Sequence, residues 1–154
     1  MSLDEKPKVL VIDDDPDFLD LYSMQLSPRF EVHIARDGQE GVEMLADITP
    51  AVVLLDLSMP RMSGRDVLKY MAARPRLRGL PVIIITGRRL DPSLKALFAR
   101  MPNVCRAYEK SVAVRRVASE AMKAAFTGEL YRSTHDLMAG VKRVERSMAD
   151  DPRR

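Results

Sequence analysis

The amino-terminal region reads KVLVIDDDPDFLDLY over residues 8–22. The apolar residues 9–12 are followed directly by Asp13, Asp14 and Asp15. Adjacent carboxylates repel one another, and the burial of one without a partner is costly. We therefore expect positive charge, from the protein or from a bound cation, to gather at the end of this segment.

Five short apolar segments alternate with longer amphipathic segments along the chain. Three of the five are continuously apolar, which is typical of strands covered on both faces. The segment 30–35 alternates apolar and polar residues, so we expect that strand to lie near a sheet edge. The five segments are Lys8–Ile12, Phe30–Ala35, Ala51–Leu55, Val82–Ile85 and Val104–Tyr108.

Short motifs between these segments indicate where helices begin. Asp15 and Asp91 each precede a proline, which is typical of an N-cap followed by proline at the first helical position. Asp37 with Glu40 resembles a capping box, and Ser63 is suited to cap the helix that follows it. The repeated strand–helix units predict an α/β fold with a doubly wound parallel sheet of five strands.

The composition is that of an ordinary globular chain of 154 residues, with 46% hydrophobic and 31% charged residues. No apolar run approaches the ~20 residues that span a bilayer, and the N-terminus does not resemble a signal peptide. The single cysteine, Cys105, excludes an internal disulfide, and we interpret it as a small apolar residue of a strand. We expect a cytoplasmic protein with no membrane partner.

The net charge of +3 hides an uneven distribution of charged residues. Residues 1–73 contain 14 acidic and 7 basic residues, whereas residues 74–116 contain 2 acidic and 11 basic residues. This asymmetry does not fit a uniformly basic nucleic-acid-binding surface, and we expect no direct DNA binding by this chain. The basic part is interpreted either as a solvated face or as a docking surface for an acidic partner.

Polar residues follow four of the strands at their carboxyl ends. In a doubly wound sheet, the functional crevice lies outside these ends. Clustered carboxylates form an oxygen site suited to Mg²⁺, and a carboxylate beside such a cation can act as a nucleophile and become an acyl phosphate. A lysine and a threonine hydroxyl would contact phosphoryl oxygens. The residues are Asp13 and Asp14 after the first strand, Asp56 after the third, Thr86 after the fourth and Lys110 after the fifth.

These motifs resemble those of the receiver domains of two-component response regulators. The resemblance covers residues 7–126 and includes DD at 13–14, DLSMPRMSG from Asp56, TG from Thr86 and the lysine at 110. It implies a flavodoxin-like sheet in the strand order 2-1-3-4-5 with five flanking helices. Residues 127–154 are then a C-terminal helical extension or a linker.

The resemblance also implies a role for each residue of the acidic cluster. Asp56 would be the phospho-acceptor. Asp14, Asp56 and the backbone carbonyl of Ser58 would bind Mg²⁺, with Asp13 acting mainly through water. Asp15 matches no ligand of the family and is better interpreted as a helix cap.

The chain departs from the family pattern at two places near Lys110. Ser111 follows the lysine where the family usually has a proline with a cis peptide bond, and a cis bond without proline costs ~3–4 kcal/mol. Ala107 occupies the position of the usual switch aromatic, and Tyr108 comes one residue later. Because side chains alternate along a strand, we expect Tyr108 to point away from the usual switch surface unless a bulge intervenes.

The last part of the chain has an apolar stripe with a spacing of 4, 3, 4, 3 and 4 residues. The stripe over residues 129–148 indicates either a coiled-coil seam, and so a homodimer, or a helix that packs on its own domain. His135 within it is interpreted as a solvated histidine rather than a phosphotransfer residue. The stripe consists of Leu130, Thr134, Leu137, Val141, Val144 and Met148.

The sequence thus predicts a signalling switch rather than an enzyme. A sensor histidine kinase or phosphotransfer protein would transfer a phosphoryl group to Asp56 in the presence of Mg²⁺, and an unknown downstream protein would read the result. An aspartyl-phosphate phosphatase-like enzyme is an alternative, since Asp13 and Asp15 have the spacing of its nucleophile motif. A receiver segment cut from a longer multidomain regulator is another.

Overall fold

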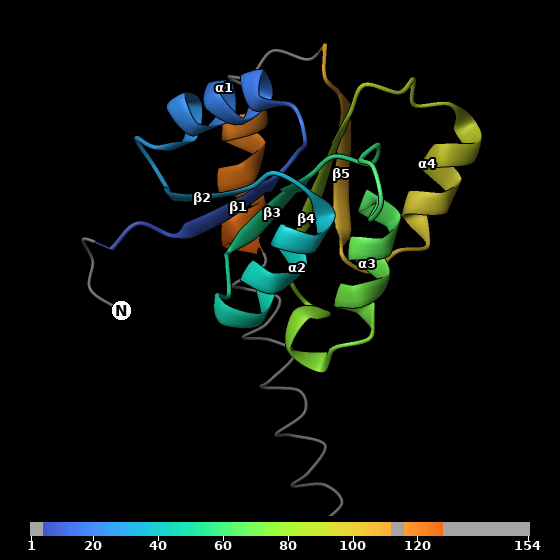
Figure 1. Ribbon diagram of the computed structural model, residues 1–154, viewed down its shortest axis with the longest axis horizontal. Helices are drawn as coiled ribbons and strands as arrows, with labels where there is room; N and C mark the ends of the chain where they lie inside the picture. The colour runs from blue at the N-terminus through green and yellow to red at the C-terminus, as the bar shows by residue number, and fades with distance from the viewer. Residues whose placement is uncertain (1–4, 112–115, 128–154) are drawn as a thin grey trace, which may run out of the picture.

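A computed structural model describes residues 5–111 and 116–127 of the chain. Five parallel strands form one sheet in the order β2-β1-β3-β4-β5, as the sequence predicted (Figure 1). Each strand lies within one residue of its expected position. The strands are β1 (Lys8–Ile12), β2 (Glu31–Ala35), β3 (Val52–Leu55), β4 (Val82–Thr86) and β5 (Val104–Glu109).

Helices cover both faces of the sheet (Figure 1). On one face, α2, α3 and α4 pack over a core that includes Leu10, Leu55 and Ile84. On the other face, α1 and a helical segment over residues 116–127 pack over a core that includes Val11 and Ile83. The helices are α1 (Pro16–Leu26), α2 (Gly38–Asp47), α3 (Gly64–Ala72) and α4 (Pro92–Ala99), with a 3₁₀ turn η1 (Pro75–Leu77) after α3.

The expected helix N-caps are confirmed at all four positions. The Asp15 and Asp91 side chains accept backbone N–H groups at the starts of α1 and α4, and Ser63 forms a capping box with Asp66 at α3. At α2, Asp37 accepts the Glu40 N–H, but the Glu40 carboxylate accepts the N–H of Arg36 instead of that of Asp37. The prediction of a capping box at α2 is therefore only half correct.

The edge position expected for the second strand is confirmed, and β5 forms the other edge of the sheet. A bulge interrupts the pairing of β5 with β4, because Val82 pairs with Val104 and Ile83 pairs with Arg106. Cys105 is the additional residue. It lies in β5 as the sequence predicted, and it is exposed.

The bulge precedes Ala107 and Tyr108, so these two residues still face opposite sides of the sheet. Ala107 packs in the core beneath α4, whereas Tyr108 packs in the core beneath the helical segment 116–127. Arg116 lies over the Tyr108 ring, with 5.6 Å between its guanidinium carbon and the ring centroid. Among the described residues, the Lys110–Ser111 bond included, no peptide bond is cis.

Within residues 5–111 and 116–127, no helix has the length and apolar character needed to cross a bilayer. The apolar stripe over 129–148 and His135 lie outside the described residues, and the division of the chain at 126 and 127 stays a prediction.

Gly64 allows the start of α3 to approach the end of β3 closely. A Cβ atom at this position would lie 2.3 Å from the Asp56 carbonyl oxygen and 2.8 Å from the Leu57 Cα. Both neighbours are backbone atoms, which cannot rotate away. The amide of Gly64 also donates to the Leu57 carbonyl at 3.1 Å, so the glycine fixes the loop that carries Asp56 and Ser58.

We predict that Gly64→Ala destabilises the protein, although alanine is the better helix former. The overpacked contact should lower the free energy of unfolding by about 1–3 kcal/mol. Urea unfolding followed by circular dichroism measures the change.

Gly87→Ala is the matched control, because the nearest atom to its added Cβ is Lys110 Cδ at 4.0 Å. This variant should stay within about 0.5 kcal/mol of the wild type. Equal stability of the two variants would contradict the assignment of Gly64 as a close-packing residue.

Candidate functional site

The three acidic residues of the predicted cluster lie together at the carboxyl edge of the sheet. Asp13 follows β1 and Asp56 follows β3, and these two side chains are only 2% and 3% exposed. Asp14 is exposed to solvent. Each of the three offers a carboxylate oxygen, and these oxygens lie within 4.8 Å of one another. The sequence therefore placed these acids correctly.

Lys110 follows β5 and supplies the positive charge that the acidic cluster requires. Its Nζ lies 2.9 Å from Asp13 Oδ2 and 3.4 Å from Asp56 Oδ2. The same ammonium lies over the ring of Phe18 of α1, 4.4 Å from the ring centroid. One cation therefore joins the ends of β1, β3 and β5.

The protonation states follow from burial and from these neighbours. Burial and then the nearby Asp13 charge raise the pKa of Asp56 to about 6, although Lys110 opposes the shift. Burial disfavours the charge of Lys110, but its hydrogen bond and charge interaction with Asp13, together with the Asp56 charge, outweigh burial and raise its pKa. Burial and then the charge of Asp13 raise the pKa of the Tyr22 hydroxyl beneath the cluster. Lys110 is therefore a permanent cation, whereas Asp56 is poised to exchange a proton near neutral pH.

The acidic cluster opens into a cavity of about 490 Å³. Asp56 stands in its wall with Oδ1 accepting the Ser58 N–H at 3.4 Å and Oδ2 facing Lys110. A small phosphorylated group can therefore reach a carboxylate oxygen of Asp56 from solvent. The cavity is lined by Asp14, Asp15, Pro16, Asp56, Ser58, Gly87, Arg88 and Lys110.

Thr86 lies at the end of β4 as expected, but it is fully buried and is not among the residues that line the cavity. Its Oγ1 accepts the Arg88 N–H at 3.1 Å, and its carbonyl accepts the Lys110 N–H at 2.7 Å. The Thr86 backbone therefore holds Lys110 in place. The Thr86 hydroxyl can still donate its own hydrogen to another acceptor.

The residues of the cluster fit a hard divalent cation. Three carboxylates within reach of one point, with Ser58 beside them in the cavity wall, provide the oxygen ligands that Mg²⁺ prefers. Asp13 is the most constrained of the three, because it also accepts the Asp15 N–H at 2.9 Å and the Lys110 ammonium. This arrangement suits the predicted division, in which Asp14 and Asp56 bind the ion directly and Asp13 acts through water.

Sequence reasoning missed two residues of the site. Phe18 has no polar group, so no motif singled it out. The available signal was its position on α1, only three residues after Asp15. Arg88 was grouped with the other basic residues of the middle segment, yet it lines the cavity that contains Asp56. Arg88 and its neighbour Arg89 are both exposed, and no signal in the sequence separates them.

Comparison with known proteins agrees with this geometry. Residues 9–101 match the response regulator receiver domain family. The chain is 39% identical over 101 residues to a protein-glutamate methylesterase/protein-glutamine glutaminase of Vibrio vulnificus, covering 62% of this chain and 28% of that protein. It is 33% identical over 82 residues to the DNA-binding dual master transcriptional regulator RpaA of Synechocystis, covering 53% of this chain and 34% of RpaA. The chain therefore spans about a third of each of these relatives.

A solved structure shows the same fold. The response regulator receiver domain protein of Methanospirillum hungatei superimposes with a TM-score of 0.73 over 82% of this chain and 99% of that chain, at 23% sequence identity. At this identity the likeness concerns the fold alone. Together with the family match over residues 9–101, it shows that this chain belongs to the response regulator receiver domains of two-component signalling.

We predict that Asp56→Asn stabilises the metal-free protein at neutral pH. The folded state raises the pKa of Asp56 from its ordinary value to about 6, so folding favours the protonated carboxyl. That contribution is fully present below pH ~4 and is lost as the pH rises through ~6. The asparagine carries no charge, so the variant should be more stable by roughly 2–3 kcal/mol at pH 7 and nearly equal to the wild type at pH 4.

Chemical unfolding in the presence of a chelator at both pH values measures this difference. Asp20→Asn removes one charge from an exposed position of α1 and should change stability by less than about 0.5 kcal/mol. A stability gain that is the same at both pH values would contradict the assigned cause.

Proposed function

We propose that this receiver domain accepts a phosphoryl group on Asp56 and thereby switches an interaction with another protein. The observation that carries the proposal is the position of Lys110, whose ammonium lies within 3.4 Å of Asp56 Oδ2 and 2.9 Å of Asp13 Oδ2 beside an open cavity. A buried carboxylate next to a fixed cation is suited to hold the added negative charge of an acyl phosphate.

The transfer uses the ionised form of Asp56. A carboxylate oxygen attacks the phosphorus of the donor, the bond from phosphorus to the donor atom breaks, and its electron pair leaves with the donor. The product is a mixed anhydride between the Asp56 carboxyl and phosphate. Because the pKa of Asp56 is about 6, most of the carboxylate is ionised at neutral pH and remains available as the nucleophile.

The remaining residues of the chain position and stabilise the product. Lys110 would pair with a phosphoryl oxygen and exchange part of its contact with Asp13, and the Thr86 hydroxyl would donate to another oxygen. Asp14, Asp56 and the Ser58 carbonyl would hold Mg²⁺, which would neutralise charge at the phosphoryl oxygens. Gly87 has no side chain, and a Cβ there would find only Lys110 Cδ, at 4.0 Å. The cavity wall at Gly87 therefore stays open.

The phosphoryl donor is a sensor histidine kinase or a phosphotransfer protein. In the cytoplasm, the chain acts as a switch rather than as a turnover enzyme. An aspartyl-phosphate phosphatase requires Asp15 as a catalytic acid, but Asp15 caps α1 by accepting the Asp17 N–H at 3.0 Å. That contact favours the receiver over the phosphatase. Because the relatives reported above are longer proteins, a receiver segment of a longer regulator remains part of the proposal.

The phosphorylation site is tested by incubation with acetyl phosphate followed by intact-mass measurement. The wild type and the control Asp20→Asn should each gain one phosphoryl group in the presence of Mg²⁺. Asp56→Asn should gain none, and a chelator should abolish the gain in the wild type. A phosphoryl mass on Asp56→Asn, or labelling that ignores the chelator, would show that the site is assigned wrongly.

We also predict that Arg88 assists the capture of small anionic donors. Its side chain lines the cavity, and it forms no ion pair among the residues that the structure describes. Arg88→Ala should slow the labelling of Asp56 by acetyl phosphate about two- to fivefold, the size expected for one exposed charge. Arg89→Ala, an exposed neighbour outside the cavity wall, should have no effect. Equal rates for the two variants would refute the role of Arg88.

A further inference from the structure

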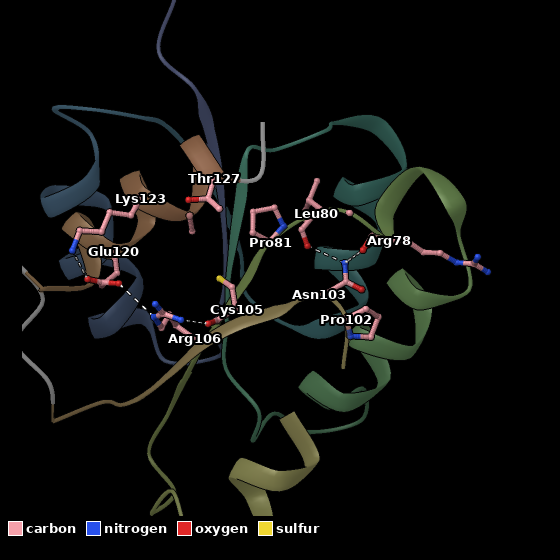
Figure 2. Close-up of a pocket in the computed structure, with 12 residues that line it drawn as sticks. Arg78, Leu80, Pro81, Pro102, Asn103, Cys105, Arg106, Glu120, Lys123 and Thr127 are labelled. Atoms are coloured by element: carbon pink, nitrogen blue, oxygen red, sulfur yellow. Dashed lines mark hydrogen bonds and ion pairs between the residues drawn. The ribbon is translucent and has the colours of Figure 1, made fainter. Parts of the chain in front are cut away.

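A second cavity lies at the opposite end of the sheet from Asp56. It has a volume of about 500 Å³ and is bounded by the loop before β4, the start of β5 and the helical segment 116–127 (Figure 2). β4 and β5 begin beside this cavity, whereas Thr86 and Lys110 follow their carboxyl ends at the phosphorylation site. The cavity therefore forms a groove separate from the candidate site, and the phosphorylation chemistry gives it no role.

The groove exists because short side chains meet at the edge of the sheet. β5 is an edge strand, and its bulge places Cys105 between the loop before β4 and the helical segment 116–127 (Figure 2). The Cys105 thiol lies 3.4 Å from the Val82 carbonyl at the floor of the groove. The neighbouring wall residues are also small: Pro81, Pro102, Ala124 and Thr127.

One wall of the groove is held rigidly by Asn103. This side chain is only 4% exposed, and its amide nitrogen donates to the carbonyl oxygens of Leu77, Arg78 and Leu80 at 2.7–2.9 Å. The two N–H groups of this amide are shared among the three carbonyls and fix the loop between η1 and β4. The groove is therefore preformed, and a ligand would not have to order this loop on binding.

The rim of the groove is positively charged. Two cationic side chains, Arg106 and Lys123, line it together with a single carboxylate, Glu120, whereas the Arg78 side chain turns away toward α3, where its Nε donates to the Ala72 carbonyl at 2.8 Å (Figure 2). Lys123 contacts Glu120 at 2.9 Å and Arg106 contacts it at 3.8 Å, so the one acid is shared between two cations. The rim keeps an excess of positive charge around an apolar floor.

An exposed aromatic side chain lies on the helical segment that forms one wall of the groove. Phe126 is 66% exposed and belongs to the same helical segment as Lys123, Ala124 and Thr127, which line the groove. Apolar surface bordered by cations fits a ligand that carries both apolar and acidic side chains.

We propose that this groove docks an amphipathic acidic segment of a partner protein. Apolar side chains of the segment would occupy the floor beside Cys105, and its carboxylates would meet Arg106 and Lys123. A second copy of the chain fits less well, because two such rims would oppose like charges. Residues 128–154 contain 6 basic and 5 acidic residues and so lack the acidic excess that the rim selects.

Cys105 gives a direct test, because it is the only cysteine of the chain and lines the groove. The rate of its modification by a maleimide, measured on the full chain at one alkaline pH, reports whether the groove is covered. The probe is a helical peptide with leucines on one face and glutamates on the other, and the reference is the same peptide with lysines. At roughly nine times its dissociation constant, the glutamate peptide should slow the modification about tenfold, and the lysine peptide should not.

Rim variants show whether the recognition is electrostatic. Arg106→Gln and Lys123→Gln should each weaken the protection by the glutamate peptide about two- to fivefold, as expected for an exposed ion pair. Arg89→Gln lies outside the groove and should leave it unchanged. Two rim variants are used because each of these cations also contacts Glu120, Arg106 at 3.8 Å and Lys123 at 2.9 Å.

Several outcomes would overturn the proposal. These are an absence of protection, equal protection by both peptides, or protection that neither rim variant weakens. If Cys105 reacts only after dilution of the protein, the groove is occupied by a second copy of the chain. If Cys105 reacts only in the full-length double variant Leu130→Ser and Leu137→Ser, the groove is occupied by the chain's own C-terminal segment. This test does not measure the labelling of Asp56, so the outcome of the Cys105 test is independent of the proposed function.

Discussion

The contact of the Lys110 ammonium with two buried carboxylates is the interaction on which the rest of the site depends. Asp13 and Asp56 are almost completely buried, and without a cation their charges would oppose folding at neutral pH. Lys110 follows β5 at the edge of the sheet, with β4 between β5 and β3. It reaches the two acids because the Thr86 carbonyl, at the end of β4, accepts the Lys110 N–H and holds its backbone in place. The carboxyl ends of β1, β3, β4 and β5 therefore meet around Lys110. A phosphoryl group on Asp56 would add negative charge where the Lys110 ammonium already neutralises two carboxylates.

Much of this arrangement could be predicted from the sequence because buried strands and helix caps have strong local signals. The continuous apolar runs at residues 9–12 and 82–85 indicated parallel strands with two covered faces. The acids and the lysine follow such runs directly, so the topology of a parallel sheet was sufficient to bring them together. The helix start at Ser63 was equally local. The strand order that brings Asp56 beside Lys110 was implied by the resemblance to receiver domains.

The features that the sequence did not predict depend on contacts between distant segments. Glu40 has two backbone partners within reach, and only the path of the chain before α2 decides that it accepts the N–H of Arg36. Arg88 and Arg89 are indistinguishable by composition, and the turn after β4 directs only the first of them toward the cavity. Cys105 lies in a strand as expected, but a one-residue mismatch with β4 changes its surroundings. No periodicity in a single segment contains this information.

The bulge at Cys105 also affects how the edge of the sheet meets other molecules. A straight edge strand offers a regular row of N–H and carbonyl groups, onto which a strand of another chain can add. In β5 the extra residue breaks the repeat of that row, and the Arg106 side chain donates to the Cys105 carbonyl at 2.9 Å at the same place. A foreign strand would find neither a matching register nor an open acceptor there. The irregularity that hollows the surface thus also protects this domain from edge-to-edge aggregation.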